Sequence, residues 1–164
     1  MKRFHVYQFL IAALVIVIDR LTKWWIASAI PLNGSGVQVI PGVFRITHIE
    51  NRGAAFGLFA DSPSPWKTSV LIALSLAAIA VIVFLLWKSS YRLNLTVVGL
   101  SLILGGAAGN FWDRVIRGRV VDFLHFYIRQ YTWPDFNVAD SAIVVGAIIL
   151  IAEILFSRPR VVEE

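Results

Sequence analysis

The feature that most constrains this chain is a set of four long apolar segments separated by polar loops. The segments cover residues 7–30, 66–87, 93–112 and 139–156. An α-helix needs about 20 apolar residues to cross the hydrocarbon core of a bilayer, and each segment comes close to that length. Only 15% of the 164 residues are charged, whereas soluble domains carry about 25%. The sequence therefore predicts one integral membrane domain, residues 1–164, with four transmembrane helices.

The basic residues predict how these helices are oriented. Four spans place both termini on one side of the membrane, together with the short loop between the second and third spans. The basic residues of this side are Lys2, Arg3, Lys88, Arg92, Arg158 and Arg160. Because they are denser than in the two long loops, the positive-inside rule places both termini in the cytoplasm. The loops 31–65 and 113–138 are then expected on the opposite, outer face, next to a belt of tryptophans at positions 24, 25, 66, 112 and 133.

The first outer loop, residues 31–65, is rich in strand signals. Residues 37–39 and 44–49 alternate apolar and polar side chains, which is typical of half-buried strands. The dipeptides Asn33-Gly34 and Pro41-Gly42 are turn signals. The predicted fold class is thus an all-α membrane protein with a small antiparallel sheet. The sheet must lie outside the hydrocarbon core, where water or headgroups can satisfy its edges.

Polar residues close to the outer ends of the spans are the candidate functional residues, because polarity within a membrane is costly. Asp19 and Lys23 lie four residues apart and share a helix face. They are interpreted either as a pair that holds a site together or as one that marks the membrane interface. Asn51 and Gly53 belong to the string 51–56, which by itself is typical of a turn after a strand.

The end of the third span combines small and polar residues. Gly105 and Gly109 form a face that another helix can approach closely. Asn110 and Arg114 follow, four residues apart and therefore on one face. The glycines are explained by helix packing alone, whereas Asn110, Asp113 and Arg114 at the helix end are not.

Two aspartates occupy unusual positions near the same membrane face. Asp122 has apolar neighbours on both sides, and burial there would raise its pKa; the alternative is an ordinary loop carboxylate paired with Arg117 or Arg119. Asn137 is a predicted N-cap of the last span. It places Asp140 at the third helical position, where the helix dipole favours an ionised carboxylate.

Together the two aspartates match the hydrolytic unit of aspartic proteases, in which two carboxylates share one proton. The side chains present disfavour cysteine-based and zinc-based catalysis. The chain has no cysteine, and its three histidines, at positions 5, 48 and 125, lack the spacing of a zinc site. No metal and no cofactor are therefore expected. No nucleic-acid partner is expected either, since basic residues near span ends usually face lipid phosphates.

These motifs resemble those of bacterial lipoprotein signal peptidase, the signal peptidase II family. Five motifs occur in the family's order, over residues 19–23, 51–56, 105–114, 120–123 and 136–140. The last three are the most specific, and the resemblance covers nearly the whole chain. Arg20 and Arg52 are departures from the family pattern, at positions that are expected to tolerate change; glutamine is commoner than arginine at position 20.

The resemblance implies an aspartic endopeptidase of the bacterial inner membrane whose active site faces the periplasm. Its substrates are prolipoproteins with diacylglycerol on a cysteine, and it cuts on the amino side of that cysteine. Membrane lipids and inhibitors of the globomycin type are the other partners it implies. Asp122 and Asp140 are the implied catalytic pair. The implied binding or supporting residues are Asp19, Lys23, Asn51, Gly53, Asn110, Arg114, Asn137 and Ala139.

Two other functions are compatible with parts of the sequence. An ion-coupled transporter could use Asp19, Asp122 and Asp140 as a proton relay, but the carboxylates cluster near one face, with Glu153 as the exception. A non-catalytic scaffold held by small-residue packing explains the glycines and leaves the paired aspartates unexplained.

Overall fold

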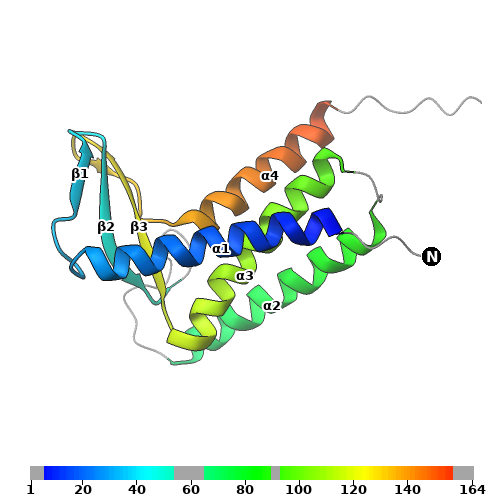
Figure 1. Cartoon of the computed structure of the whole chain (residues 1–164), viewed down its shortest axis with the longest axis horizontal. Coiled ribbons are helices and arrows are strands. Elements are labelled where there is room, and N and C mark those ends of the chain that lie inside the picture. The colour runs from blue at the N-terminus through cyan, green and yellow to red at the C-terminus, as the bar shows by residue number, and fades with distance from the viewer. Residues whose placement is uncertain (1–5, 54–64, 90–92, 157–164) are drawn as a thin grey trace, which may run out of the picture.

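Long helices lie beside one another in the computed structural model, and a small sheet covers one end of them (Figure 1). The structure describes residues 6–53, 65–89 and 93–156. The elements, in chain order, are α1 (Val6–Ala29), β1 (Val37–Ile40), β2 (Phe44–Asn51), α2 (Pro65–Lys88), α3 (Leu95–Arg117), β3 (Val120–Ile128), β4 (Tyr131–Thr132) and α4 (Val138–Phe156).

Three of the described helices, α2, α3 and α4, are long and apolar enough to cross a membrane. They correspond to the predicted spans 66–87, 93–112 and 139–156. The helix α1 covers the predicted span 7–30, but its 24 residues include Asp19, Arg20 and Lys23. Because three charged residues are many for a segment that crosses a membrane, a crossing by α1 stays a prediction.

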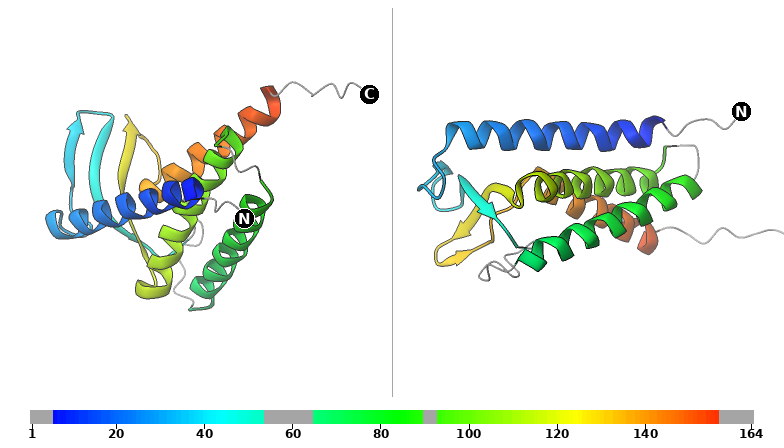
Figure 2. Two further views of the ribbon diagram at one scale, coloured as in Figure 1. Left: turned by 45° about the vertical axis from the view of Figure 1, so that its right-hand side comes forward. Right: turned by 90° about the horizontal axis from the view of Figure 1, so that it is seen from below.

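The helix α3 contacts the other three helices and is the centre of the bundle (Figure 2). A Cβ atom added at Gly105 would lie 2.7 Å from the carbonyl oxygen of Ala12 in α1. One added at Gly106 would overlap the carbonyl oxygen of Ala139 in α4, and one at Gly109 would lie 2.9 Å from the Asp19 carboxylate. The expected close helix approach at Gly105 and Gly109 is confirmed, and Gly106 extends it to α4.

The sheet combines both long loops. Its strand order is β1-β2-β3-β4, and every neighbouring pair is antiparallel. The strands predicted in the first loop are confirmed as β1 and β2. The sequence signals indicated no strands in the loop 113–138, but this loop forms β3, which pairs with β2 so that Asp122 lies opposite Ile49. Val121 and Phe123 pack against Ile26 in α1 and Ile30 just after it, which explains the apolar neighbours of Asp122.

The third span is longer than predicted. The sequence places its end at residue 112, but α3 continues to Arg117 and ends at Gly118, whose φ of 66° is left-handed. The Gly118 N–H donates to the carbonyl oxygen of Arg114, as in a common helix C-cap. The charged residues 113 and 114 do not end the helix, because Asp113 is fully buried against α1.

The α3–α4 contact predicts the effect of enlarging Gly106. Gly106→Ala should lower the free energy of unfolding by about 1–3 kcal/mol, since two backbones must separate. That loss exceeds the gain of up to about 1 kcal/mol from replacing a helical glycine by alanine. Thermal unfolding in detergent measures the change. The control Ala77→Val adds volume on the exposed face of α2 and should have little effect; equal stability of both variants would contradict the close packing.

Candidate active site

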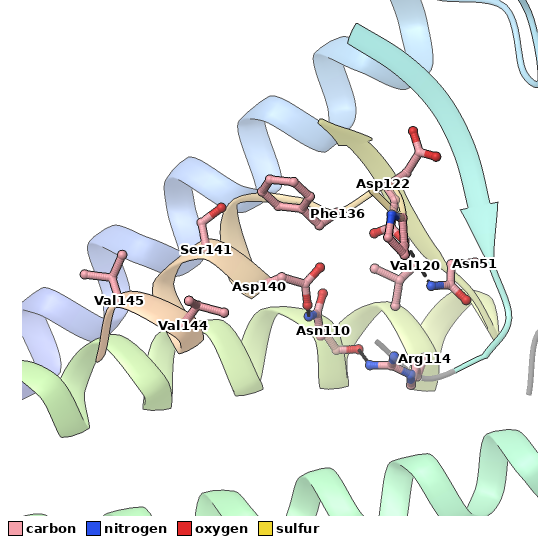
Figure 3. A pocket seen from close by; sticks show the side chains of 12 residues that line it. Asn51, Asn110, Arg114, Val120, Asp122, Phe136, Asp140, Ser141, Val144 and Val145 are labelled. Atoms are coloured by element: carbon pink, nitrogen blue, oxygen red, sulfur yellow. Dashed lines mark hydrogen bonds between the residues drawn. The ribbon is translucent and has the colours of Figure 1, made fainter. Parts of the chain in front are cut away.

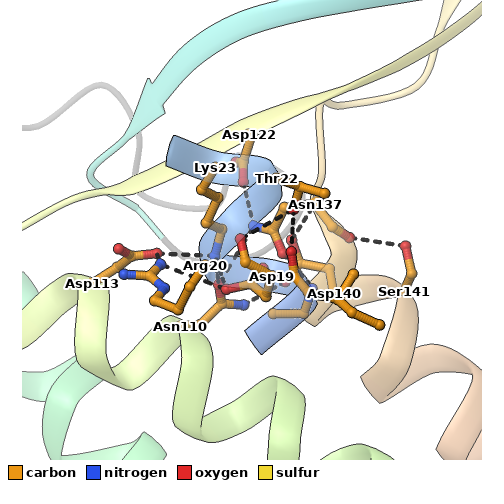
Figure 4. A network of polar contacts seen from close by, with 12 residues as sticks. Asp19, Arg20, Thr22, Lys23, Asn110, Asp113, Asp122, Asn137, Asp140 and Ser141 are labelled. Atoms are coloured by element: carbon orange, nitrogen blue, oxygen red, sulfur yellow. Dashed lines mark hydrogen bonds and ion pairs between the residues drawn. The ribbon is translucent and has the colours of Figure 1, made fainter. Parts of the chain in front are cut away.

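The Lys23 ammonium is the centre of a buried polar network between α1 and α3 (Figure 4). It donates three hydrogen bonds, to Asp19 Oδ2 at 2.8 Å, to Asn110 Oδ1 at 3.0 Å and to Asp113 Oδ2 at 2.9 Å. Lys23 is 1% exposed, and both carboxylates are fully buried. Arg20 supplies a second cation to Asp113. The alternative of an interfacial pair is therefore wrong, because Asp19 and Lys23 lie inside the protein.

Asp19 also binds the start of α4. Its Oδ1 atom accepts a hydrogen bond from the backbone N–H of Ala139 at 3.1 Å. The predicted capping residue Asn137 is confirmed, since its Oδ1 accepts from the Asp140 N–H at 3.0 Å. In return, Asp140 Oδ2 accepts from the Asn137 N–H at 3.2 Å. This reciprocal capping box fixes where the Asp140 carboxylate lies.

Asn110 joins the Lys23 network to Asp140. Its side-chain oxygen accepts from Lys23, so its amide nitrogen is the atom available to the Asp140 carboxylate. That nitrogen donates to Asp140 Oδ1 at 2.8 Å. The buried ammonium thus determines the orientation of an amide, and the amide holds one oxygen of Asp140.

Asp122 lies on β3 and is held by two amides. Asn137 Nδ2 donates to its Oδ1 at 2.7 Å, and Asn51 Nδ2 donates to its Oδ2 at 3.0 Å. Asn51 is oriented in turn by the Gly53 N–H, which donates to its side-chain oxygen at 2.7 Å. The alternative partner Arg119 instead pairs with Glu50 at 3.0 Å, and Arg117 is exposed at the end of α3.

The environment of Asp122 disfavours its charged form. Burial is the largest cause and the nearby Asp140 carboxylate is the second; together they raise the pKa of Asp122 to about 7. The hydrogen bonds from Asn51 and Asn137 and the charge of Lys23 oppose this shift. Near neutral pH, Asp122 therefore exists in both protonation states.

Both aspartates line one cavity of about 290 Å³ (Figure 3). Its polar wall includes Asn51, Asn110 and Arg114, and its apolar wall Val120, Phe136, Val144 and Val145. Arg114 donates to the carbonyl oxygen of Gly53 at 3.2 Å and so connects α3 to the segment after β2. The cavity therefore presents two carboxylates to a ligand that is otherwise largely apolar.

The structure brings together the residues that the sequence singled out. Five of these residues line the cavity: Asn51, Asn110, Arg114, Asp122 and Asp140. Four others lie outside it and hold the lining residues or the start of α4 in place: Asp19, Lys23, Asn137 and Ala139. Gly53 contributes its backbone. Positions 54–56 of the predicted motif lie outside the described residues. Among residues 6–53, 65–89 and 93–156, no cluster of three or more histidine, aspartate or glutamate side chains could hold a metal ion.

The sequence left the role of Asp113 unexplained and missed Asp135 altogether. Asp113 lies three positions after Asn110 and thus on the same helix face, and the structure makes it a partner of Lys23. Asp135 lines the cavity and accepts a hydrogen bond from Thr47 of β2. No local sequence signal marks Asp135, because its partner Thr47 comes from a strand far away in the chain.

The chain is similar to known proteins along almost its whole length. Residues 11–156 match the family model described as signal peptidase (SPase) II. A lipoprotein signal peptidase of Solibacter usitatus (strain Ellin6076) is 48% identical over 150 residues, which are 92% of this chain and 90% of that protein. One of Francisella tularensis subsp. novicida (strain U112) is 40% identical over 152 residues, 93% of each chain.

Solved structures agree with these sequence matches. A bacterial membrane enzyme determined by the in meso method at 2.3 Å resolution superposes with a TM-score of 0.82 and 34% identity, over 96% of this chain and 93% of that one. A second, determined at 1.9 Å, has a TM-score of 0.78 and 35% identity, over 93% of this chain and 94% of that one.

The network predicts a large cost for removing the buried ammonium. Lys23→Met should lower the free energy of unfolding by about 3–5 kcal/mol, because the buried carboxylates of Asp19 and Asp113 would then have only Arg20 as a cation, and one negative charge would remain uncompensated. Chemical denaturation in detergent measures this loss. The matched control Glu50→Gln breaks the partly exposed pair with Arg119 and should cost at most about 1 kcal/mol. Similar costs for both variants would show that the Lys23 network does not hold the helices together.

Proposed function

The chain belongs to the signal peptidase II family, and we propose that it removes signal peptides from diacylglyceryl-modified prolipoproteins by an aspartic mechanism. The cut falls on the amino side of the lipidated cysteine. One observation carries the proposal: Asp122 and Asp140 line the same cavity, and a separate set of amides holds each of them. Two carboxylates in different environments are what general acid and general base catalysis require.

In the proposed reaction, Asp122 is the acid and Asp140 the base. Asp140 takes a proton from a water molecule as the water oxygen attacks the carbonyl carbon of the scissile bond. Asp122 gives its proton to the carbonyl oxygen, so a neutral tetrahedral diol forms. The C–N bond then breaks, Asp140 passes its proton to the leaving nitrogen, and Asp122 recovers a proton from a diol hydroxyl. Both carboxyls return to their starting states.

The contacts of the two carboxyls support this assignment. Asp122 is buried on β3, and its pKa is raised to about 7, which suits a proton donor. Asp140 accepts hydrogen bonds from Asn110 and from the backbone N–H of Asn137 at the start of α4, and such contacts favour an ionised carboxylate. Arg114 acts as a positioning residue, since it holds the backbone of Gly53 against α3.

The position of the cavity supports entry of the substrate from the lipid. Val144 and Val145 line the cavity and are also 47% and 48% exposed on α4. An apolar signal helix can therefore reach the carboxylates without leaving the bilayer. We place the sheet on the periplasmic face of the inner membrane and both termini in the cytoplasm. A cyclic peptide inhibitor of the globomycin type would occupy the same cavity.

The proton-relay alternative has no comparable support. Asp19 is bound by Lys23 and by the start of α4 and is therefore committed to a structural role. Glu153, near the other end of α4, accepts a hydrogen bond from Thr96. Among the described contacts, no chain of hydrogen-bonded polar side chains connects Asp19 with Glu153.

Neutralising either aspartate tests the proposed catalytic pair. Asp122→Asn and Asp140→Asn should each lower kcat by about 10³-fold or more, since the proton donor or the proton acceptor is lost. Cleavage of a synthetic diacylglyceryl prolipoprotein by purified protein is the measurement. Glu153→Gln, a carboxyl-to-amide change on the same helix as Asp140, is the control and should retain activity. Normal turnover by both aspartate variants would refute the aspartic mechanism.

The raised pKa of Asp122 predicts a pH dependence. The acid must be protonated, so kcat/KM should fall as the pH rises through about 7 and then decrease about tenfold per pH unit. Initial rates on the same substrate in buffers of constant ionic strength give the profile. A rate that stays constant up to about pH 9 would mean that Asp122 is not the proton donor.

A further inference from the structure

A second cavity adjoins the catalytic one. Its volume is about 310 Å³, and it lies against the sheet. Four of its lining residues, Asn51, Asp122, Pro134 and Asp135, also line the first cavity. The two cavities therefore meet at Asp122, the proposed proton donor.

The two cavities differ in the chemistry of their remaining walls. Those of the first are mainly apolar and include Val144 and Val145 on the exposed surface of α4. The second adds Ile49, Glu50 and Arg52 from β2 and the residue after it. An endopeptidase binds its substrate on both sides of the scissile bond. The apolar cavity suits the signal peptide, and the polar cavity suits the residues after the cut.

The charges of the second cavity are not equally available to a ligand. Glu50 pairs with Arg119 at 3.0 Å. Asp135 pairs with His125 at 3.1 Å and accepts a hydrogen bond from Thr47 at 2.5 Å. Arg52 is exposed, and no described residue forms a hydrogen bond or an ion pair with its guanidinium. Arg52 is therefore the lining charge that remains for a substrate side chain.

We propose that the second cavity binds the substrate residue that follows the lipidated cysteine, and that Arg52 makes this subsite favour an acidic side chain. The inference rests on the proposed function and adds a specificity-determining residue to it. Because Arg52 is exposed, its ion pair with the substrate is weak and is screened by salt. The expected preference is about three- to fivefold in kcat/KM at low ionic strength.

A charge reversal at Arg52 tests the subsite. Three synthetic diacylglyceryl peptides, identical except for Asp, Asn or Lys after the modified cysteine, are cleaved by purified protein. The wild-type protein should prefer them in that order. Arg52→Gln should remove the order, and Arg52→Glu should reverse it. The control Arg129→Glu makes the same change of charge in the turn between β3 and β4, where the residue is exposed and lines neither cavity; it should keep the wild-type order.

The outcomes separate this inference from the function on which it rests. If the wild-type protein cleaves all three peptides at equal rates, or if Arg52→Glu keeps the wild-type order, the subsite is refuted while the peptidase function stands. If Arg129→Glu also reverses the order, the preference reflects overall charge, and the subsite is again refuted. If the wild-type protein cleaves none of the peptides, the proposed function itself fails.

Discussion

The buried ammonium of Lys23 is the interaction on which the rest of the structure depends. Two carboxylates and an amide surround it, from α1 and α3, and every proton of the ammonium has an acceptor. Charges removed from water are costly, and the three hydrogen bonds of the ammonium offset part of that cost. Because Asp19 also binds the Ala139 N–H, the same cluster determines where α4 begins. The position of Asp140 follows from that beginning.

Two side-chain amides give the two carboxyls different environments. Asn110 is oriented by Lys23 and donates to Asp140. Asn137 caps α4 and also donates to Asp122. One carboxyl therefore lies at a helix N-terminus and the other on a buried strand. The asymmetry arises from the backbone, so it exists before any substrate binds. Glycines at the helix contacts allow it, since side chains at Gly105, Gly106 or Gly109 would push α1 and α4 away from α3.

Much of this architecture follows from local sequence signals. The strands of the first loop and the helices α2, α3 and α4 can be predicted because each pattern lies within one segment. The helix cap formed by Asn137 and Asp140 can be predicted for the same reason. The strand β3 was missed because it is stabilised by pairing with β2, about 70 residues away in the sequence. The true end of α3 was missed because Asp113 is buried by a lysine from α1, and Asp135 depends on Thr47 in the same way.

We propose that the two carboxyls share one proton, which Asp122 holds in the resting protein. Infrared spectroscopy tests this directly, because a protonated carboxyl and a carboxylate absorb at different frequencies. Below pH 7, we expect the band of one buried carboxylic acid, and this band should disappear in Asp122→Asn. Asp140 should contribute a carboxylate band over the same range. A protonated Asp140 beside an ionised Asp122, or two ionised carboxylates at that pH, would refute the shared proton on Asp122.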